Sequence, residues 1–321
     1  MSGAIPDFVS LPLGLVLLVL GAEMLVRGAS ALAARLRVSE LAVGLTVVAF
    51  GTSMPELSVS LFASAAGRPE VLLGNAIGSN LFNVLVILGV SAVVFPLAVQ
   101  RRTVRREIPL SLAATALVLL MAFDNSLWPR GLTGLSRLEG AVLLALFAAF
   151  LWYIARSLGQ DLQPAGVART AGWLVAVLTG GGLLLLTVGG RLVVDGAVGI
   201  ARTAGISDRV VSLTVVSAGT SLPEFATSVV AAARRKPDIS VGNVVGSNIF
   251  NLTAALGLGL MVRPSNEPRG SVADLLVLVA ATAALMLAML TGGRRRLDRW
   301  EGVLFVFFYA GYVVWLLFGQ R

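Results

Sequence analysis

Long apolar segments recur along the whole 321-residue chain, and this pattern constrains its fold more than any other feature. A helix needs about 20 apolar residues to cross a bilayer. Because the segments are continuously apolar rather than alternating, they predict membrane helices and not a β-barrel. Ten segments lie between charged residues, near 10–27, 40–66, 70–95, 108–123, 138–157, 172–190, 207–233, 238–262, 272–290 and 301–319.

The composition excludes most other classes of protein. Hydrophobic residues make up 57% of the chain and charged residues only 13%, too few to cover a water-exposed surface. This excludes a cytosolic enzyme, a secreted disulfide scaffold and a soluble nucleic-acid binder. The chain has no cysteine or histidine, the commonest zinc ligands. We therefore expect an all-α, multi-pass protein of the cell membrane that contacts the lipid bilayer, with no cofactor, no nucleic acid and no protein partner implied.

Basic residues indicate the topology. If the N-terminus lies outside, the connections between the ten segments place sixteen Lys and Arg residues inside and nine outside. Cytoplasmic connections carry an excess of such residues, so this arrangement is favoured. The sequence thus predicts ten transmembrane helices with both termini outside.

An internal duplication divides the chain. Residues 45–83 align without gaps on residues 213–251 at a constant offset of 168, and 20 of the 39 positions are identical. Each half then holds five helices, and an odd number requires the second half to enter the membrane inverted. We expect a first repeat at 1–160, with its duplicated motifs within 40–95, and a second at 161–321, with its motifs within 207–262. Inverted repeats are typical of transporters.

Two acidic residues, Glu56 and Glu224, occupy equivalent positions inside apolar segments. A charge at such depth costs about 2.5–3.5 kcal/mol unless it has a partner. The duplicated segments contain no basic residue to pair with them, so the partner is an ion, a proton or polar neighbours. A purely structural alternative is a pair of protonated glutamates that bridge helices.

The polar neighbours of these glutamates favour an ion. Thr52 lies four residues before Glu56, on the same helix face, and the second half repeats this pair. Asn75, Ser79 and Asn83 form a stripe at helical spacing, which recurs as Asn243, Ser247 and Asn251. Carboxylate, hydroxyl and amide oxygens suit hard cations such as Ca²⁺ or Na⁺.

Prolines interrupt the same two helices. Pro55 and Pro223 each lack an N–H and clash with the carbonyl four residues back, which belongs to Gly51 or Gly219. Such a kink alone often only shapes packing. Two breaks at matching positions, each followed by a buried glutamate, instead predict a transporter site with freed carbonyls.

The two copies of G-T-S-x-P-E and G-N-x-x-G-S-N-x-F-N resemble the paired α-repeats of the calcium/cation antiporter superfamily, most closely its microbial sodium/calcium exchangers. The resemblance is specific over 45–83 and 213–251. It implies that Glu56 and Glu224 are the central calcium ligands. The remaining implied ligands are hydroxyl and amide residues: Thr52 and Thr220, the sodium-site serines Ser53, Ser221, Ser79 and Ser247, and Asn83 and Asn251 at the centre.

The resemblance implies an antiporter that exchanges Ca²⁺ for Na⁺ by alternating access, with both ions as substrates. Some family members carry Asp where this chain has Asn83 and Asn251, so the centre here holds two carboxylates and a charge of −2. Exchange of Ca²⁺ or another cation for H⁺ through the same glutamates is the alternative. A membrane enzyme is disfavoured because the chain lacks histidine and a mid-membrane Asp pair. A passive channel is disfavoured by the inverted repeat.

Overall fold

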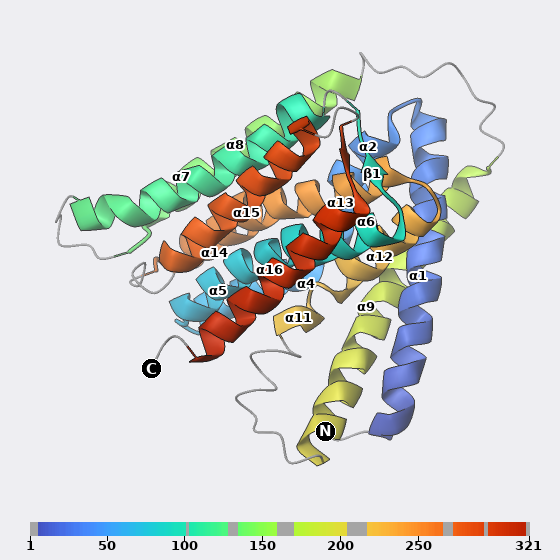
Figure 1. Cartoon of the computed structure of the whole chain (residues 1–321), viewed down its shortest axis with the longest axis horizontal. Helices are drawn as coiled ribbons and strands as arrows, with labels where there is room; N and C mark the ends of the chain where they lie inside the picture. Colours follow the sequence, from blue (N-terminus) through green and yellow to red (C-terminus); the bar gives the residue numbers. More distant parts are fainter. Residues whose placement is uncertain are drawn as a thin grey trace.

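The computed structural model is nearly all helical (Figure 1). It describes residues 6–100, 103–127, 134–158, 170–203, 217–265, 272–291 and 295–318. The elements of the first half are α1 (Asp7–Leu36), α2 (Glu40–Val43), the π-helical turn η1 (Gly44–Val48), α3 (Ala49–Thr52), α4 (Met54–Ala65), α5 (Pro69–Leu81), the π-helical turn η2 (Phe82–Ile87), α6 (Leu88–Val94), β1 (Leu97–Ala98), the π-helical turn η3 (Thr103–Glu107), α7 (Ile108–Leu127) and α8 (Arg137–Leu158).

The second half repeats much of this order. Its elements are α9 (Gly172–Thr203), α11 (Ser217–Gly219), α12 (Leu222–Ala233), α13 (Pro237–Ile249), the π-helical turn η5 (Phe250–Ala255), α14 (Leu256–Val262), α15 (Val272–Thr291), β2 (Arg296–Leu297) and α16 (Arg299–Phe318). From α4 to α6, every helical boundary recurs 168 residues later in α12 to α14, including the π-helical turn. The duplicated sequence therefore folds into a duplicated structure.

The predicted break in the second apolar segment is confirmed. The helix that ends at Thr52 resumes at Met54, and the two parts meet at an angle of 48°. Pro55 sits in the first turn of α4, where its missing N–H breaks no intrahelical bond. In the other half, α11 and α12 flank the equivalent break, whereas residues 207–216 of the seventh predicted segment lie outside the described residues.

The last helix of each half packs against the other half. Gly140 of α8 lies against Gly257 of α14, and Gly302 of α16 lies against Gly89 of α6. Short backbone pairings accompany both contacts. The strands β1 and β2 pair antiparallel, and Leu135 bridges to Ser265. These short β pairings depart from the expected all-α fold in the described part of the chain, and together the contacts interlock the two halves.

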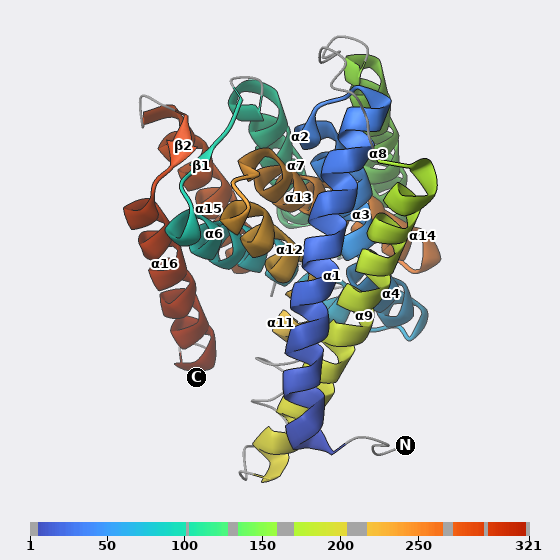
Figure 2. The same ribbon diagram turned by 90° about the vertical axis from the view of Figure 1, so that its right-hand side faces the viewer.

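Helices α1 and α9 lie side by side as a pair that extends beyond the rest of the bundle (Figures 1 and 2). A Cβ on Gly21 would lie only 2.8 Å from the backbone N of Leu186, and one on Gly189 would lie 2.8 Å from that of Leu18. Glycine at these positions allows the backbones to approach closely, as small residues do in membrane helices. Both helices run past the predicted segments, which end at residues 27 and 190.

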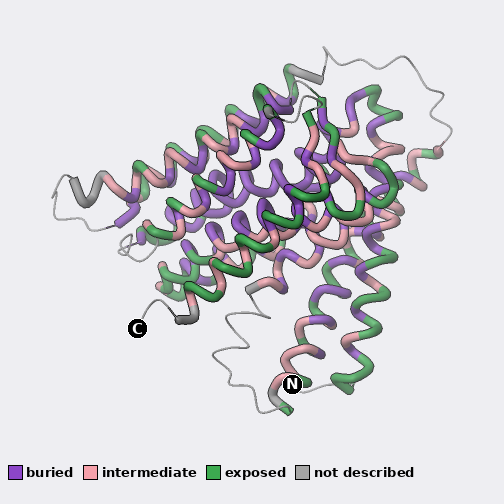
Figure 3. Tube along the Cα trace, in the orientation of Figure 1, coloured by how far each residue is buried: buried purple, intermediate pink, exposed green. Residues whose placement is uncertain are grey.

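The duplicated helices occupy the centre of the bundle, as the buried parts of the trace show (Figure 3). In the most apolar stretch of α13–α14, 89% of residues are buried, against 22% in α8 and in α9. The outer helices expose large apolar side chains such as Trp152 and Phe307. Within the described residues, seven helices are long and apolar enough to cross a membrane, or eight with the bent α2–α4 pair. The predicted count of ten stays a prediction.

Candidate cation-binding site

The broken helices place both glutamates in equivalent positions at the centre. Glu56 lies in the first turn of α4 and Glu224 in the first turn of α12, and each is 1% exposed. The free N–H groups of a helix start favour a carboxylate there. The preceding short helix ends at Thr52, where its last carbonyls favour a cation. Each break thus offers a carboxylate and carbonyl oxygens in the same place.

The serine of each G-T-S-x-P-E motif reaches the glutamate of the other half. Ser53 Oγ donates to Glu224 Oε1 at 2.7 Å, and Ser221 Oγ donates to Glu56 Oε1 at 3.0 Å. Ser53 Oγ also lies 2.9 Å from Ser247 Oγ. The site is therefore shared between the halves, and neither half forms it alone.

The first asparagine of each stripe supports the glutamate backbone. Asn75 Nδ2 donates to the carbonyl of Glu56 at 3.0 Å, and Asn243 Nδ2 donates to that of Glu224 at 3.3 Å. Thr52 Oγ1 donates to Asn243 Oδ1 at 3.1 Å. These bonds fix α5 against α4 and α13 against α12 at the depth of the glutamates.

Two further asparagines, Asn80 and Asn248, were missed by the sequence analysis. Asn83 Nδ2 donates to Asn248 Oδ1 at 3.0 Å, and Asn251 Nδ2 donates to Asn80 Oδ1 at 3.2 Å. Asn80 Nδ2 also donates to the carbonyl of Asn248 at 3.0 Å. Both belong to the repeated G-S-N motif, and that repetition was the available signal. Both lie off the stripe at i, i+4 and i+8, so helical spacing does not group them with the other polar residues.

Several oxygens at the centre lack a hydrogen-bond partner among the described residues. They are Glu56 Oε2, Glu224 Oε2, Asn83 Oδ1, Asn251 Oδ1 and Thr220 Oγ1. A buried polar atom without a partner costs about 1–3 kcal/mol, and more when it is charged. The first four form two equivalent pairs from the two halves, so the lack of partners is a repeated feature. Such a set of oxygens suits a hard cation.

The structure joins some of the predicted site residues directly, because Ser53 and Ser221 bond to the two glutamates and Ser53 also bonds to Ser247. Within the described residues, Asn83 and Asn251 bond instead to Asn248 and Asn80, and no hydrogen bond joins these two amides or Ser79 to a glutamate. Nine of the ten are buried, namely Thr52, Ser53, Glu56, Ser79, Asn83, Ser221, Glu224, Ser247 and Asn251, whereas Thr220 is half-buried. Within the described part of the chain, no group of three or more His, Cys, Asp or Glu side chains could hold a metal ion. The site has two carboxylates and otherwise neutral oxygens, which disfavours zinc or copper.

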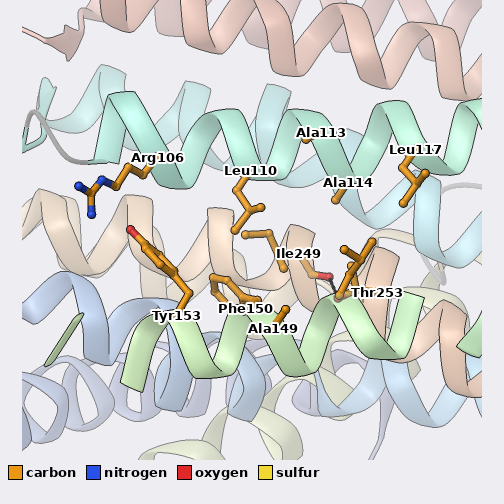
Figure 4. Close-up of a pocket in the computed structure, with 11 residues that line it drawn as sticks. Arg106, Leu110, Ala113, Ala114, Leu117, Ala149, Phe150, Tyr153, Ile249 and Thr253 are labelled. Carbon is orange, nitrogen blue, oxygen red and sulfur yellow. Dashed lines mark hydrogen bonds between the residues drawn. The ribbon is translucent and has the colours of Figure 1, made fainter. Parts of the chain in front are cut away.

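A separate cavity between α7 and α8 does not belong to this site (Figure 4). It has a volume of about 480 Å³ and is lined mainly by apolar side chains such as Leu110, Phe150 and Ile249. Arg106 and Tyr153 lie at one end of it. Its lining contains no carboxylate, so it lacks the chemistry of the glutamate centre.

Fold and site together define a membrane protein with an oxygen-lined centre between duplicated broken helices. Comparison with known proteins gives the family. The sodium/calcium exchanger protein family matches residues 7–156 and 174–318, so the chain belongs to this family and is a multi-pass membrane protein.

Individual relatives match over nearly their whole length. The inner membrane protein YrbG of Escherichia coli (strain K12) is 36% identical, with 94% of this chain and 93% of that protein covered. The sodium/calcium exchanger MaX1 of Methanosarcina acetivorans is 29% identical, with 97% and 99% covered. A solved structure of the sodium-calcium exchanger NCX_Mj superposes with a TM-score of 0.81 at 32% identity, covering 97% of this chain and 98% of that one.

Proposed function

We propose that this protein is a secondary antiporter that exchanges Ca²⁺ for Na⁺ across the membrane by alternating access. The observation that carries the proposal is the repeated set of buried oxygens without hydrogen-bond partners at Glu56, Glu224, Asn83 and Asn251. Ca²⁺ takes about 6–8 oxygen ligands. These four atoms, the second oxygen of each carboxylate and the carbonyls at the helix breaks supply a set of that size.

Charge balance supports exchange at one shared centre. With both glutamates ionised the centre carries −2, which one Ca²⁺ neutralises, as two Na⁺ do. Because no basic side chain among the described residues pairs with these glutamates, the ions themselves compensate the buried charge. In this proposal Thr52 and Thr220 add oxygens to the centre. Ser53, Ser221, Ser79 and Ser247 line flanking Na⁺ sites.

The proposed architecture has ten spans in two inverted halves, 1–160 and 161–321, with both termini outside. Equivalent helix breaks, π-helical turns and cross-half contacts at the 168-residue offset support it. Transporters built from inverted repeats bind their ions where broken helices meet near the midplane. The exchangers among its relatives support the same class of activity rather than catalysis or passive conduction.

Transport in membrane vesicles tests the coupling ion. Ca²⁺ uptake is measured with an outward Na⁺ gradient, with an outward H⁺ gradient of equal driving force, and with neither. The proposal predicts Na⁺-driven uptake that generates a current if three Na⁺ exchange for each Ca²⁺. Uptake driven by H⁺ and indifferent to Na⁺ would favour Ca²⁺/H⁺ exchange through the same two glutamates.

A further inference from the structure

A cavity of about 540 Å³ lies between α4, α9 and the α11–α12 break, beside the candidate site. Its wall includes both kink prolines, Pro55 and Pro223, and also Thr220, whose Oγ1 has no hydrogen-bond partner among the described residues. Helix α9 contacts α11 and α12 and passes beside them in Figure 1. The cavity therefore adjoins the broken helix that begins with Glu224.

One face of α9 forms a wall of this cavity. Its lining residues follow helical spacing and are Thr187, Gly190, Arg191, Val194 and Asp195. A Cβ on Gly190 would lie 3.8 Å from the side chain of Pro223, and one on Gly219 would collide with Val194. This face thus packs directly against the break, with its two charged side chains at the cavity.

Arg191 and Asp195 are the charged residues of the cavity lining. Both are exposed, and neither forms an ion pair within the described residues. Their equivalents 168 residues earlier are Glu23 and Arg27 of α1, with acid and base exchanged. Glu23 contacts Arg27 at 2.6 Å and Arg234 at 2.8 Å. The charges of α1 therefore connect protein groups, whereas those of α9 face open volume.

We infer that Arg191 and Asp195 set the local concentration of cations in this cavity: Asp195 attracts them and Arg191 repels them. The inference rests on the proposed function and adds two residues that control ion access from one side of the membrane. A charge-lined cleft with low-dielectric walls focuses the field and raises the local concentration of oppositely charged ions. The effect depends on ion valence, since the local enrichment of a divalent ion is the square of that of a monovalent ion.

The test is the apparent KM for Ca²⁺ and for Na⁺ in vesicles of opposite orientation at low ionic strength. Removal of one unit charge about 10 Å from the ion changes the local concentration about fourfold for Ca²⁺ and about twofold for Na⁺. Asp195→Asn should raise both KM values by these factors, and Arg191→Gln should lower them. The maximal rate should stay constant, and only ions added on the cavity side should show the change.

Salt and a matched variant separate this effect from a structural one. The KM shift should fade when choline chloride raises the ionic strength to about 1 M, where the Debye length is about 3 Å. Glu70→Gln is the control, because Glu70 is exposed at the start of α5 and outside the cavity lining. A salt-independent shift, or the same factor for Ca²⁺ and Na⁺, would overturn the electrostatic role.

The absence of cysteine allows a second test. Asp195→Cys should be modified by membrane-impermeant methanethiosulfonates from one side only. A sulfonate reagent should restore the low Ca²⁺ KM, and a trimethylammonium reagent should raise it further. Equal effects of both reagents would overturn the inference while leaving Ca²⁺ transport itself intact. If the unmodified protein transports no Ca²⁺ in any gradient, the proposed function fails instead.

Discussion

The two halves of the candidate site have the same residues in different surroundings. Thr52 is 1% exposed and donates to Asn243 Oδ1 at 3.1 Å. Its equivalent Thr220 is half-buried, has no hydrogen-bond partner among the described residues and lines the cavity beside α9. The same motif is therefore enclosed in one half and lies at the wall of a cavity in the other, although Thr220 Oγ1 itself is buried. An alternating-access protein made of two repeats needs such a difference, because only one side is open at a time.

The glutamates themselves are the most similar pair across the two halves. Each is 1% exposed, each accepts a hydrogen bond from a serine of the opposite half, and each has one oxygen without a partner among the described residues. The two halves therefore have the same surroundings at the glutamates and different surroundings at Thr52 and Thr220. The following predictions use this contrast, in order of decreasing effect.

The largest effect should come from Glu56→Gln and Glu224→Gln. Each change removes one of two buried charges that share the ion, and loss of a partner from a buried charge set costs about 3–5 kcal/mol. We expect a more than 100-fold loss of Ca²⁺ exchange in vesicles for both variants, roughly 100-fold corresponding to 2.7 kcal/mol. Glu70→Gln should exchange normally. A strong loss in one variant with normal exchange in the other would break the equivalence of the two glutamates.

Asn83→Ala and Asn251→Ala should have an intermediate effect. Each variant loses one neutral oxygen at the centre and a hydrogen bond to Asn248 or Asn80. Hydrogen bonds to charged groups are worth about 1.5–3 kcal/mol, and we expect a contact between an amide oxygen and Ca²⁺ to be of the same order, so that Ca²⁺ affinity falls at least about 10-fold. Ca²⁺ titration of purified protein measures it. Unchanged Ca²⁺ affinity in both variants would show that these two amides do not bind Ca²⁺.

Thr52→Val and Thr220→Val should differ in their effect on the thermal stability of the protein. The first variant loses a bond to Asn243 and should unfold at lower temperature, with a loss of about 1 kcal/mol. The second lacks the equivalent bond to Asn75 and should lose less stability than the first. Thermal unfolding in detergent is the measurement. Equal destabilisation would show that the two threonines have similar surroundings.

The smallest effect is expected at the outer pair of helices. Glu23→Gln removes exposed ion pairs with Arg27 and Arg234, which are worth about 0.2–1 kcal/mol each. Arg191→Gln removes no ion pair among the described residues and should leave the melting temperature unchanged. Melting curves at low and high salt should show a salt-dependent difference for Glu23→Gln alone. A salt-dependent difference for Arg191→Gln, with none for Glu23→Gln, would contradict the contrast between the ion-paired charges of α1 and the charges of α9 that form no ion pair.

Most of the bundle follows from local sequence physics. Continuous apolar runs predicted the membrane helices, and Pro55 predicted a break that occurs between Thr52 and Met54. The repeat identified both glutamates, because buried charged groups in apolar segments need partners. Ser53 and Ser221 were implied by the family resemblance, and their bonds across the two halves were not predicted. The apolar runs and the helix break depend on residues close in sequence, which is why the sequence pattern was sufficient for them.

Other features depend on tertiary contacts. Asn80 and Asn248 lie one residue outside the recognised stripe, and only the packing of α5 against α13 reveals their bonds. Arg191 and Asp195 resemble the end of an apolar segment, although α9 continues to Thr203 and turns them toward a cavity. The difference between Thr52 and Thr220 cannot be read from identical motifs, because it depends on the elements that pack around each of them.

The central claim is that Glu56 and Glu224 form one centre at which Ca²⁺ and Na⁺ compete. Ca²⁺ binding isotherms on purified protein, at increasing Na⁺ and constant ionic strength, test it most directly. The apparent Kd for Ca²⁺ should rise with Na⁺ at constant binding capacity, and Glu56→Gln and Glu224→Gln should both lose binding. Ca²⁺ binding that is indifferent to Na⁺, or retained in both variants, would contradict a shared site.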